Sequence, residues 1–198
     1  MEDARIGQLK DLHAKLKNFT QDWAARKEVD MAAGDKIREE ILRLNHQRYM
    51  DLIPIYRDLA GDLGAPQNPD LDYIAAELVS TDDIFKSYNP AFLESKDFNA
   101  MTRWLETLHT KKINVQADDV KTVSAWIARL AEGKVFSTFS SGTSGRLSFV
   151  PRDDYNWDNF LNNSAAYIAC LFAGLDMSYE NFDSVSLSFK GGNMGVGL

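Results

Sequence analysis

The sequence predicts a chain that is helical over its first two thirds and carries β-strands after that, an α+β arrangement over these 198 residues. As far as Leu130, apolar residues recur at three- and four-residue spacing, which is the period of an amphipathic helix, except over residues 71–95, where the pattern is short and broken. After Gly133, apolar and polar residues alternate, which is the period of a half-buried strand. We therefore expect two regions, a mainly helical one over residues 1–132 and a second over residues 133–198.

The first helices are predicted from their apolar stripes and from the residues that interrupt them. One stripe runs from Ile6 to Trp23. Gly34 interrupts the pattern, so we expect the second helix to begin after it, with Asp35 as its cap. Pro54 starts or kinks the next helix, because proline lacks a backbone N–H and fits a first helical turn.

Two further helices are expected before the strands. Asn89-Pro90 indicates a turn, and helical spacing returns over residues 98–108 and 120–130. The pair Asp118-Asp119 is the expected opening of the second of these helices, because carboxylates favour a helix N-terminus. Gly133 is its expected end.

The last third is predicted to contain a β-hairpin, a helix and another strand. Residues 135–140 alternate, and residues 147–150 form a second short run that ends at Pro151. The pair Asp153-Asp154 is expected to begin a helix. Residues 184–189 alternate serine with apolar side chains, which indicates a further half-buried strand.

The composition limits the classes of partner and location. A formal charge of −7 argues against a nucleic-acid partner, because a phosphate backbone requires a basic face. The single cysteine, Cys170, excludes a disulfide framework. The charged N-terminus lacks the apolar run of an export signal, and the longest apolar run, residues 165–175, is far shorter than the roughly 18 residues that span a bilayer. We therefore expect a cytoplasmic protein without a membrane span.

The hairpin loop, Phe139-Ser-Ser-Gly-Thr-Ser-Gly-Arg146, combines hydroxyl groups, glycines and a cation. Glycines allow backbone N–H groups to approach an anion, and the arginine fork fits phosphate oxygens. The loop is no Walker motif, because Gly142 and Gly145 are too close in sequence and no lysine follows. The same residue types also occur in flexible hairpin tips. The residues alone therefore leave a phosphate-binding loop and a flexible tip open.

The order of these residues closely resembles the phosphate-binding loop of acyl-adenylate-forming enzymes, [ST]-[ST]-G-[ST]-[ST]-G. The phenylacetate–CoA ligase branch and the acyl-protein synthetases of bacterial luminescence are the most similar, since they place a basic residue directly after the last glycine, where Arg146 stands. The segment Ile53-Pro-Ile-Tyr-Arg57 looks like the P-x-Y-R segment of such ligases. Leu147 and Ser148 depart from the commoner loop, which has proline and lysine there.

The resemblance implies an α/β nucleotide-binding core that begins at residue 133, and it implies an ATP-dependent reaction. A carboxylic acid would attack the α-phosphate of ATP, giving an acyl-adenylate and pyrophosphate, and the acyl group would pass to CoA or to a protein thiol. Arg146 would neutralise phosphate charge, and a Mg²⁺ ion is expected although the sequence assigns it no ligands. The residues that the resemblance places on the β- and γ-phosphates are Ser140, Ser141, Gly142, Thr143, Ser144, Gly145 and Arg146.

The resemblance also implies that the parent enzyme is longer. The family's adenine, ribose and lysine motifs have no counterpart in residues 147–198, so we expect an N-terminal portion that does not adenylate by itself and whose catalytic residues are unassigned. The alternative from another class is a non-catalytic helical interaction module whose serine-rich hairpin is only a tip. His13, His46 and His109 lack metal-ligand spacing and indicate no metal site.

Overall fold

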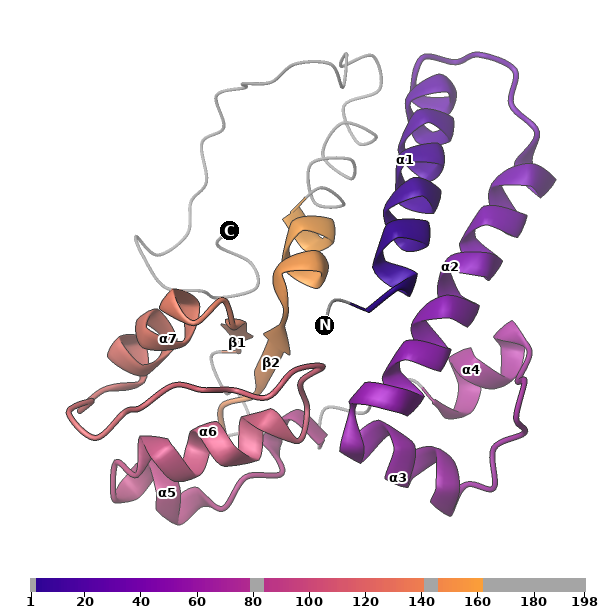
Figure 1. Cartoon of the computed structure of the whole chain (residues 1–198). Helices are drawn as coiled ribbons and strands as arrows, with labels where there is room; N and C mark the ends of the chain where they lie inside the picture. Colours follow the sequence, from indigo (N-terminus) through magenta and orange to yellow (C-terminus); the bar gives the residue numbers. More distant parts are fainter. Residues whose placement is uncertain (1–2, 79–83, 141–145, 162–198) are drawn as a thin grey trace. The chain divides into compact units, whose positions relative to one another are not determined.

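The computed structural model describes residues 3–78, 84–140 and 146–161, which form helices and one small sheet (Figure 1). The helices are α1 (Arg5–Ala24), α2 (Met31–Leu52), α3 (Pro54–Asp62), α4 (Leu71–Glu77), the 3-10 helix η1 (Ile84–Lys86), α5 (Pro90–Glu94), α6 (Phe98–Glu106) and α7 (Val123–Glu132). The strands β1 (Phe136–Phe139) and β2 (Phe149–Arg152) pair antiparallel, and a helix whose described part covers residues 154–161 follows. These residues are mostly helical with a small antiparallel sheet, consistent with the α+β arrangement.

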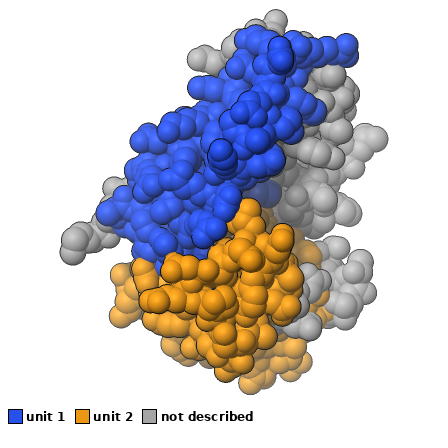
Figure 2. All heavy atoms as spheres, turned by 90° about the vertical axis from the view of Figure 1, so that its right-hand side faces the viewer, with its two compact units in different colours: residues 1–48, 158–185 blue, residues 49–157, 186–198 orange. Residues whose placement is uncertain are grey.

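The chain divides into two compact units, which are coloured separately in Figure 2. One contains residues 1–48 and 158–185, and the other contains residues 49–157 and 186–198. The division falls inside α2, so this helix belongs in part to each unit. The separation into regions 1–132 and 133–198 stays a prediction.

In the first unit, α1 and α2 form an antiparallel helical hairpin (Figure 1). Gln8 near the start of α1 donates to Glu40 in α2, with 3.0 Å between Nε2 and Oε1. Arg48, further along α2, lies 3.3 Å from the Asp3 carboxylate. The predicted stripe of α1 is buried in its first part, at Ile6, Leu9 and Leu12, and Ile41 of α2 is also buried. Trp23, at the end of the stripe, is 50% exposed.

The expected start of the second helix at Asp35 is wrong. The helix begins at Met31, where the Asp30 carboxylate accepts a backbone N–H of the first turn at 3.0 Å. Gly34 lies inside α2 and is buried beneath the ring of Phe19, where an added Cβ would lie 2.7 Å from Cζ. The glycine therefore permits close helix packing and does not interrupt the helix.

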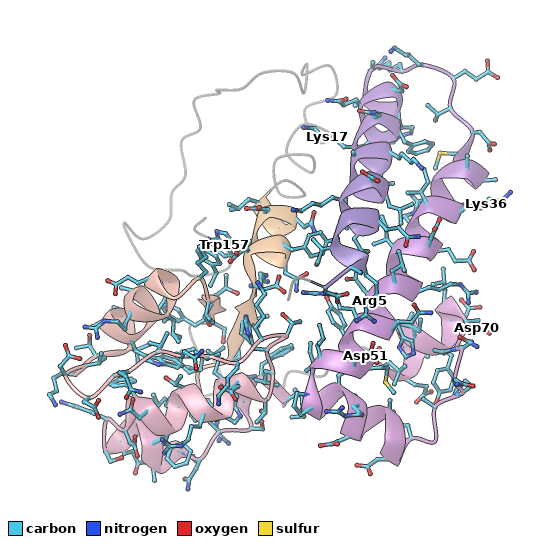
Figure 3. All side chains as sticks on the ribbon, in the orientation of Figure 1. Arg5, Lys17, Lys36, Asp51, Asp70 and Trp157 are labelled. Atoms are coloured by element: carbon cyan, nitrogen blue, oxygen red, sulfur yellow. The ribbon has the colours of Figure 1, made fainter. Side chains whose placement is uncertain are left out.

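Two apolar clusters lie among the described residues of the second unit, and the smaller one surrounds α3 and α4. Pro54 occupies the first turn of α3, as the sequence predicts. Asp70 caps α4 by accepting the N–H of its first turn at 2.8 Å, and its side chain is labelled in Figure 3. The buried residues of this cluster are Tyr56, Ala60, Ile74 and Leu78.

The larger cluster of the second unit joins α6 and α7 to the hairpin. Trp126 and Phe149 are fully buried at its centre, with ring centroids 5.4 Å apart. The Trp126 indole N–H donates to the Thr102 hydroxyl at 2.9 Å, so its one polar atom is satisfied. At the end of the hairpin away from the loop, Phe136 stacks on Trp157, with ring centroids 5.1 Å apart. Trp157 is labelled in Figure 3.

Two helix starts differ from the predictions. Asn89-Pro90 begins α5 and is not a turn, because the Asn89 side chain accepts a backbone N–H at 3.1 Å and proline fills the first turn. The cap of α7 is Thr122 and not a residue of Asp118-Asp119. Asp119 instead binds Arg129 at 3.0 Å. Gly133 ends α7 as expected.

The hairpin is confirmed, with a shifted second strand. β2 covers Phe149–Arg152, whereas the sequence predicts residues 147–150 ending at Pro151. Pro151 lies inside the strand, opposite Ser137. The Ser140 N–H donates to the Ser148 carbonyl, so these two residues form a hydrogen-bonded pair. Hydrogen-bonded and non-hydrogen-bonded pairs alternate along an antiparallel ladder, so Ser137 and Pro151, three positions further along, do not bond to each other. Proline is tolerated at such a position.

Some expectations lie outside the described residues. They concern Cys170, the apolar run at 165–175 and the strand at 184–189. Within the described ranges, the helices are too short or too polar to cross a membrane.

We expect Gly34→Ala to lower the free energy of unfolding by about 1 kcal/mol, because the new methyl group displaces the Phe19 ring. Alanine's higher helix propensity acts in the opposite direction. Urea unfolding followed by circular dichroism measures the change.

Gly7→Ala is the matched control, because Gly7 lies in α1 with nothing within 4 Å of an added Cβ. This variant is expected to be more stable by about 0.5 kcal/mol. Equal stabilisation by both substitutions would contradict the close-packing role of Gly34.

Candidate functional site

The structure describes the two ends of the predicted phosphate loop. Ser140 directly follows β1, and Arg146 precedes β2. The other residues that the sequence assigns to phosphate binding lie outside the described residues: Ser141, Gly142, Thr143, Ser144 and Gly145. The described part of the candidate site is therefore the base of the loop.

The antiparallel strands bring Ser140 and Ser148 together at the base of the loop. The Ser140 N–H donates to the Ser148 carbonyl at 3.1 Å. The Ser148 hydroxyl donates to the Ser140 hydroxyl, with 2.8 Å between the oxygens. Because Ser140 accepts this bond and is exposed, its own hydroxyl proton is available to an acceptor in the loop.

Arg146 lies against Tyr88, which comes from the segment between η1 and α5. The guanidinium carbon lies 4.7 Å from the centre of the Tyr88 ring, a cation–π arrangement. Nη2 of Arg146 also donates to the Tyr88 carbonyl. The Tyr88 hydroxyl in turn donates to the Leu147 carbonyl at 3.0 Å. The end of the loop is thus attached to one tyrosine by its side chain and by its main chain.

The guanidinium of Arg146 keeps unused donors. Its Nε is buried, and no described atom accepts a hydrogen bond from it. Within residues 3–78, 84–140 and 146–161, no carboxylate forms an ion pair with Arg146. A buried donor without an acceptor costs about 1–3 kcal/mol. An arginine of this kind beside a loop of hydroxyls and glycines is suited to an anion.

Tyr88 itself is held firmly by the larger apolar cluster. It is 2% exposed, and its ring packs edge-on against Trp104 at 5.0 Å and Phe149 at 5.7 Å. The Trp104 indole N–H donates to the Ser87 hydroxyl at 3.0 Å, which fixes the residue next to Tyr88. The guanidinium of Arg146 therefore contacts a residue that is packed into the protein core.

A second polar group lies where β2 meets the following helix. Asp153 is 1% exposed and caps this helix, because Oδ1 accepts the Asn156 N–H at 2.9 Å. Its other oxygen accepts the Thr110 hydroxyl at 2.5 Å. The sequence predicts the cap but not the contact with Thr110, which is far away in the chain. This group joins two segments and has a structural role.

Arg152 is the other arginine of the hairpin, and it points into a different environment. Its Nη1 donates to the Thr138 hydroxyl at 2.7 Å across the sheet. Burial lowers the pKa of Arg152, and the nearby Tyr49 acts in the opposite direction. Because its guanidinium is used within the sheet, Arg152 is less suited than Arg146 to an external anion.

The histidines occupy separate places. The His13 ring bonds to the Leu9 carbonyl at 2.9 Å, and His109 accepts the Lys111 N–H at 3.1 Å. His46 is buried in α2, and desolvation lowers its pKa. In the part of the chain that the structure describes, no three histidine, cysteine, aspartate or glutamate side chains gather as a metal site.

The segment Ile53–Arg57 forms the start of α3. Tyr56 is buried and meets the ring of Tyr49 edge-on at 5.7 Å. The Ile55 N–H donates to the Thr107 carbonyl at 3.3 Å, which ties α3 to the end of α6. The side chain of Arg57 is exposed. The tyrosine of this segment therefore stabilises the core.

Comparisons of the chain with protein-family models, with curated proteins and with solved structures give no match. The similarity of the loop to adenylate-forming enzymes consequently rests on the residues themselves and stays a prediction.

We expect Tyr56→Phe to reduce the loss of stability at alkaline pH. Burial, and then the neighbouring Tyr49, raise the pKa of Tyr56 from 10.0 to about 12. The neutral phenol is therefore favoured in the folded state, and its contribution is complete below pH 10 and lost as the pH rises towards 12. Between pH 9 and 11.5, the variant should lose about 1–2 kcal/mol less free energy of unfolding than the wild type. Urea unfolding at both pH values measures this, and equal losses would contradict it.

Proposed function

We propose that this chain is the N-terminal portion of an ATP-dependent adenylate-forming ligase of the phenylacetate–CoA ligase kind. Such an enzyme activates a carboxylic acid as acyl-AMP and transfers the acyl group to a thiol such as CoA. The observation that carries the proposal is the sequence of residues 140–146 between two antiparallel strands, with its arginine fixed at the loop base.

The residues at the loop base fit a polyphosphate. Ser140 offers a hydroxyl proton, and Arg146 offers a permanent positive charge with a buried, unused Nε–H. Hydrogen bonds to charged groups are roughly twice as strong as neutral ones, so a few such donors suffice to orient a phosphate chain. This supports the assignment of the β- and γ-phosphates of ATP to the loop.

In the proposed reaction, an oxygen of the substrate carboxylate attacks the α-phosphorus of ATP. A new P–O bond forms, the bond between the α-phosphorus and the bridging oxygen breaks, and pyrophosphate leaves with the electron pair. Negative charge accumulates on the leaving group, and Arg146 stabilises it. A Mg²⁺ ion bound to the nucleotide would supply further neutralisation, since magnesium commonly binds through substrate phosphates with few protein ligands.

The finer fold belongs to the same proposal. The β1–β2 hairpin and the helix over residues 154–161 would be the start of an α/β nucleotide-binding core, from residue 133 onward. The acceptor divides the proposal in two, because an acyl-protein synthetase would pass the acyl group to a protein thiol and not to CoA. Residues 140–146 are compatible with either acceptor.

The alternative is a non-catalytic helical interaction module. Trp23 and Met31, on either side of the turn between α1 and α2, are 50% and 51% exposed. Exposed large apolar residues can belong to a contact surface. This module would use the helical hairpin and leave residues 140–146 without a ligand.

We expect MgATP to slow hydrogen exchange of residues 139–150 in the wild-type chain. Arg146→Ala should weaken MgATP binding about 10- to 100-fold, since a charged hydrogen-bonding group is lost. Arg129→Ala is the matched control, because Arg129 is a partly exposed arginine in the last turn of α7 that binds Asp119. Unchanged exchange in the wild type, or equal effects of both variants, would favour the interaction module.

We also expect the isolated 198-residue chain to show no ATP–pyrophosphate exchange above an inactive control that combines Ser141→Ala and Arg146→Ala. The reason is that the family's adenine, ribose and lysine motifs have no counterpart in residues 147–198. Radioactive pyrophosphate incorporation into ATP in the presence of assorted carboxylic acids measures this. Exchange above the control would show that the chain is sufficient for the chemistry.

A further inference from the structure

We infer that Tyr88 is a positioning residue, which holds the Arg146 guanidinium in one orientation before a polyphosphate binds. This inference rests on the proposed function. Nothing in the sequence around Tyr88 indicates such a role, because Tyr88 and Arg146 are 58 positions apart.

The attachment of the loop end to Tyr88 uses three different parts of the tyrosine. The ring face lies under the guanidinium of Arg146, the main-chain carbonyl accepts from Nη2, and the hydroxyl donates to the Leu147 carbonyl. One residue therefore orients the side chain of Arg146 and the main chain that follows it. A residue that only filled the core would need none of these polar contacts.

The position of Tyr88 is itself determined by its surroundings. Its ring is enclosed by Trp104 and Phe149. The next residue, Asn89, caps α5 by accepting a backbone N–H at 3.1 Å, which fixes the main chain on that side. The Tyr88 carbonyl and ring consequently form a rigid platform for the arginine.

A fixed arginine binds an anion more strongly than a mobile one. Arginine has several rotatable bonds, and immobilising such a side chain on binding has an entropic cost. Here the cation–π contact and the Nη2 bond immobilise it in advance. The remaining donors include Nε, which is buried and has no acceptor in the described part of the chain. A bound anionic oxygen would give this donor an acceptor.

The test compares two Tyr88 variants in their affinity for MgATP and for inorganic tripolyphosphate, measured by isothermal titration calorimetry. Tyr88→Met removes the ring face and the hydroxyl but fills the core, and we expect it to weaken both affinities about three- to tenfold. Tyr88→Phe retains the ring and loses only the bond to Leu147, so it should recover most of the affinity, with a loss of about twofold.

A mutant cycle separates positioning from general destabilisation. In an Arg146→Ala background, Tyr88→Met should cause no further loss of affinity, because the group that Tyr88 positions is absent. Phe98→Leu is the matched control, since Phe98 is buried in the same cluster and stacks on Trp126 at 5.9 Å. It should lower the thermal unfolding temperature and leave both affinities unchanged.

The outcomes distinguish this inference from the proposed function. If the wild type binds neither MgATP nor tripolyphosphate, both fall. If the wild type binds, three results overturn only the role of Tyr88. The first is that Tyr88→Met binds as strongly as the wild type. The others are that Tyr88→Met weakens binding as much in the Arg146→Ala background as in the wild type, or that Phe98→Leu weakens binding as much as Tyr88→Met. Should Tyr88→Met fail to fold by circular dichroism, Tyr88→Leu, which also removes the ring face and the hydroxyl, decides, and unchanged affinity in that variant overturns the inference.

Discussion

The packing of Phe149 in the larger apolar cluster is the interaction on which the hairpin depends. This fully buried ring contacts Trp126, Trp104 and Tyr88, and also Phe139 of the opposite strand. A two-stranded sheet is marginally stable by itself. The position of the hairpin is therefore determined by the helices that enclose Phe149, and the hairpin in turn fixes the residues at the base of the loop.

The hairpin is predictable from the sequence because its information is local, and phosphate binding by its loop stays a prediction. The hydroxyls, glycines and arginine of residues 140–146 follow one another, and alternation on either side predicts the hairpin. The support of the loop was not recognisable for the opposite reason. Tyr88 lies in a short, broken stretch, and an aromatic residue there indicates core packing until the fold brings Arg146 onto its face. A contact between distant residues leaves no periodic pattern in a single sequence.

The first residues of the helices are also hard to predict from the sequence, because they depend on contacts with distant residues. Apolar stripes predict α1, α6 and α7, because burial of one face determines a helix, and Pro54 predicts the start of α3. The starts were less predictable, since several residues nearby were chemically able to cap. Asp119 pairs with Arg129, which leaves Thr122 as the cap of α7. The sequence does not show the reason for a glycine at position 34, which is the Phe19 ring of another helix. Both outcomes depend on tertiary partners.

Pro151 makes the two edges of the hairpin unequal in their ability to pair with a further strand. In a pair without mutual hydrogen bonds, the main-chain groups of both residues face away from the partner strand. On the outer edge of β2, the position of Pro151 therefore lacks a donor, whereas Ser137 on the outer edge of β1 retains its N–H. A further strand would find an interrupted row of donors along β2 and a continuous one along β1. The hairpin is thus asymmetric as a template for a larger sheet, and β1 is the edge on which such a sheet would extend.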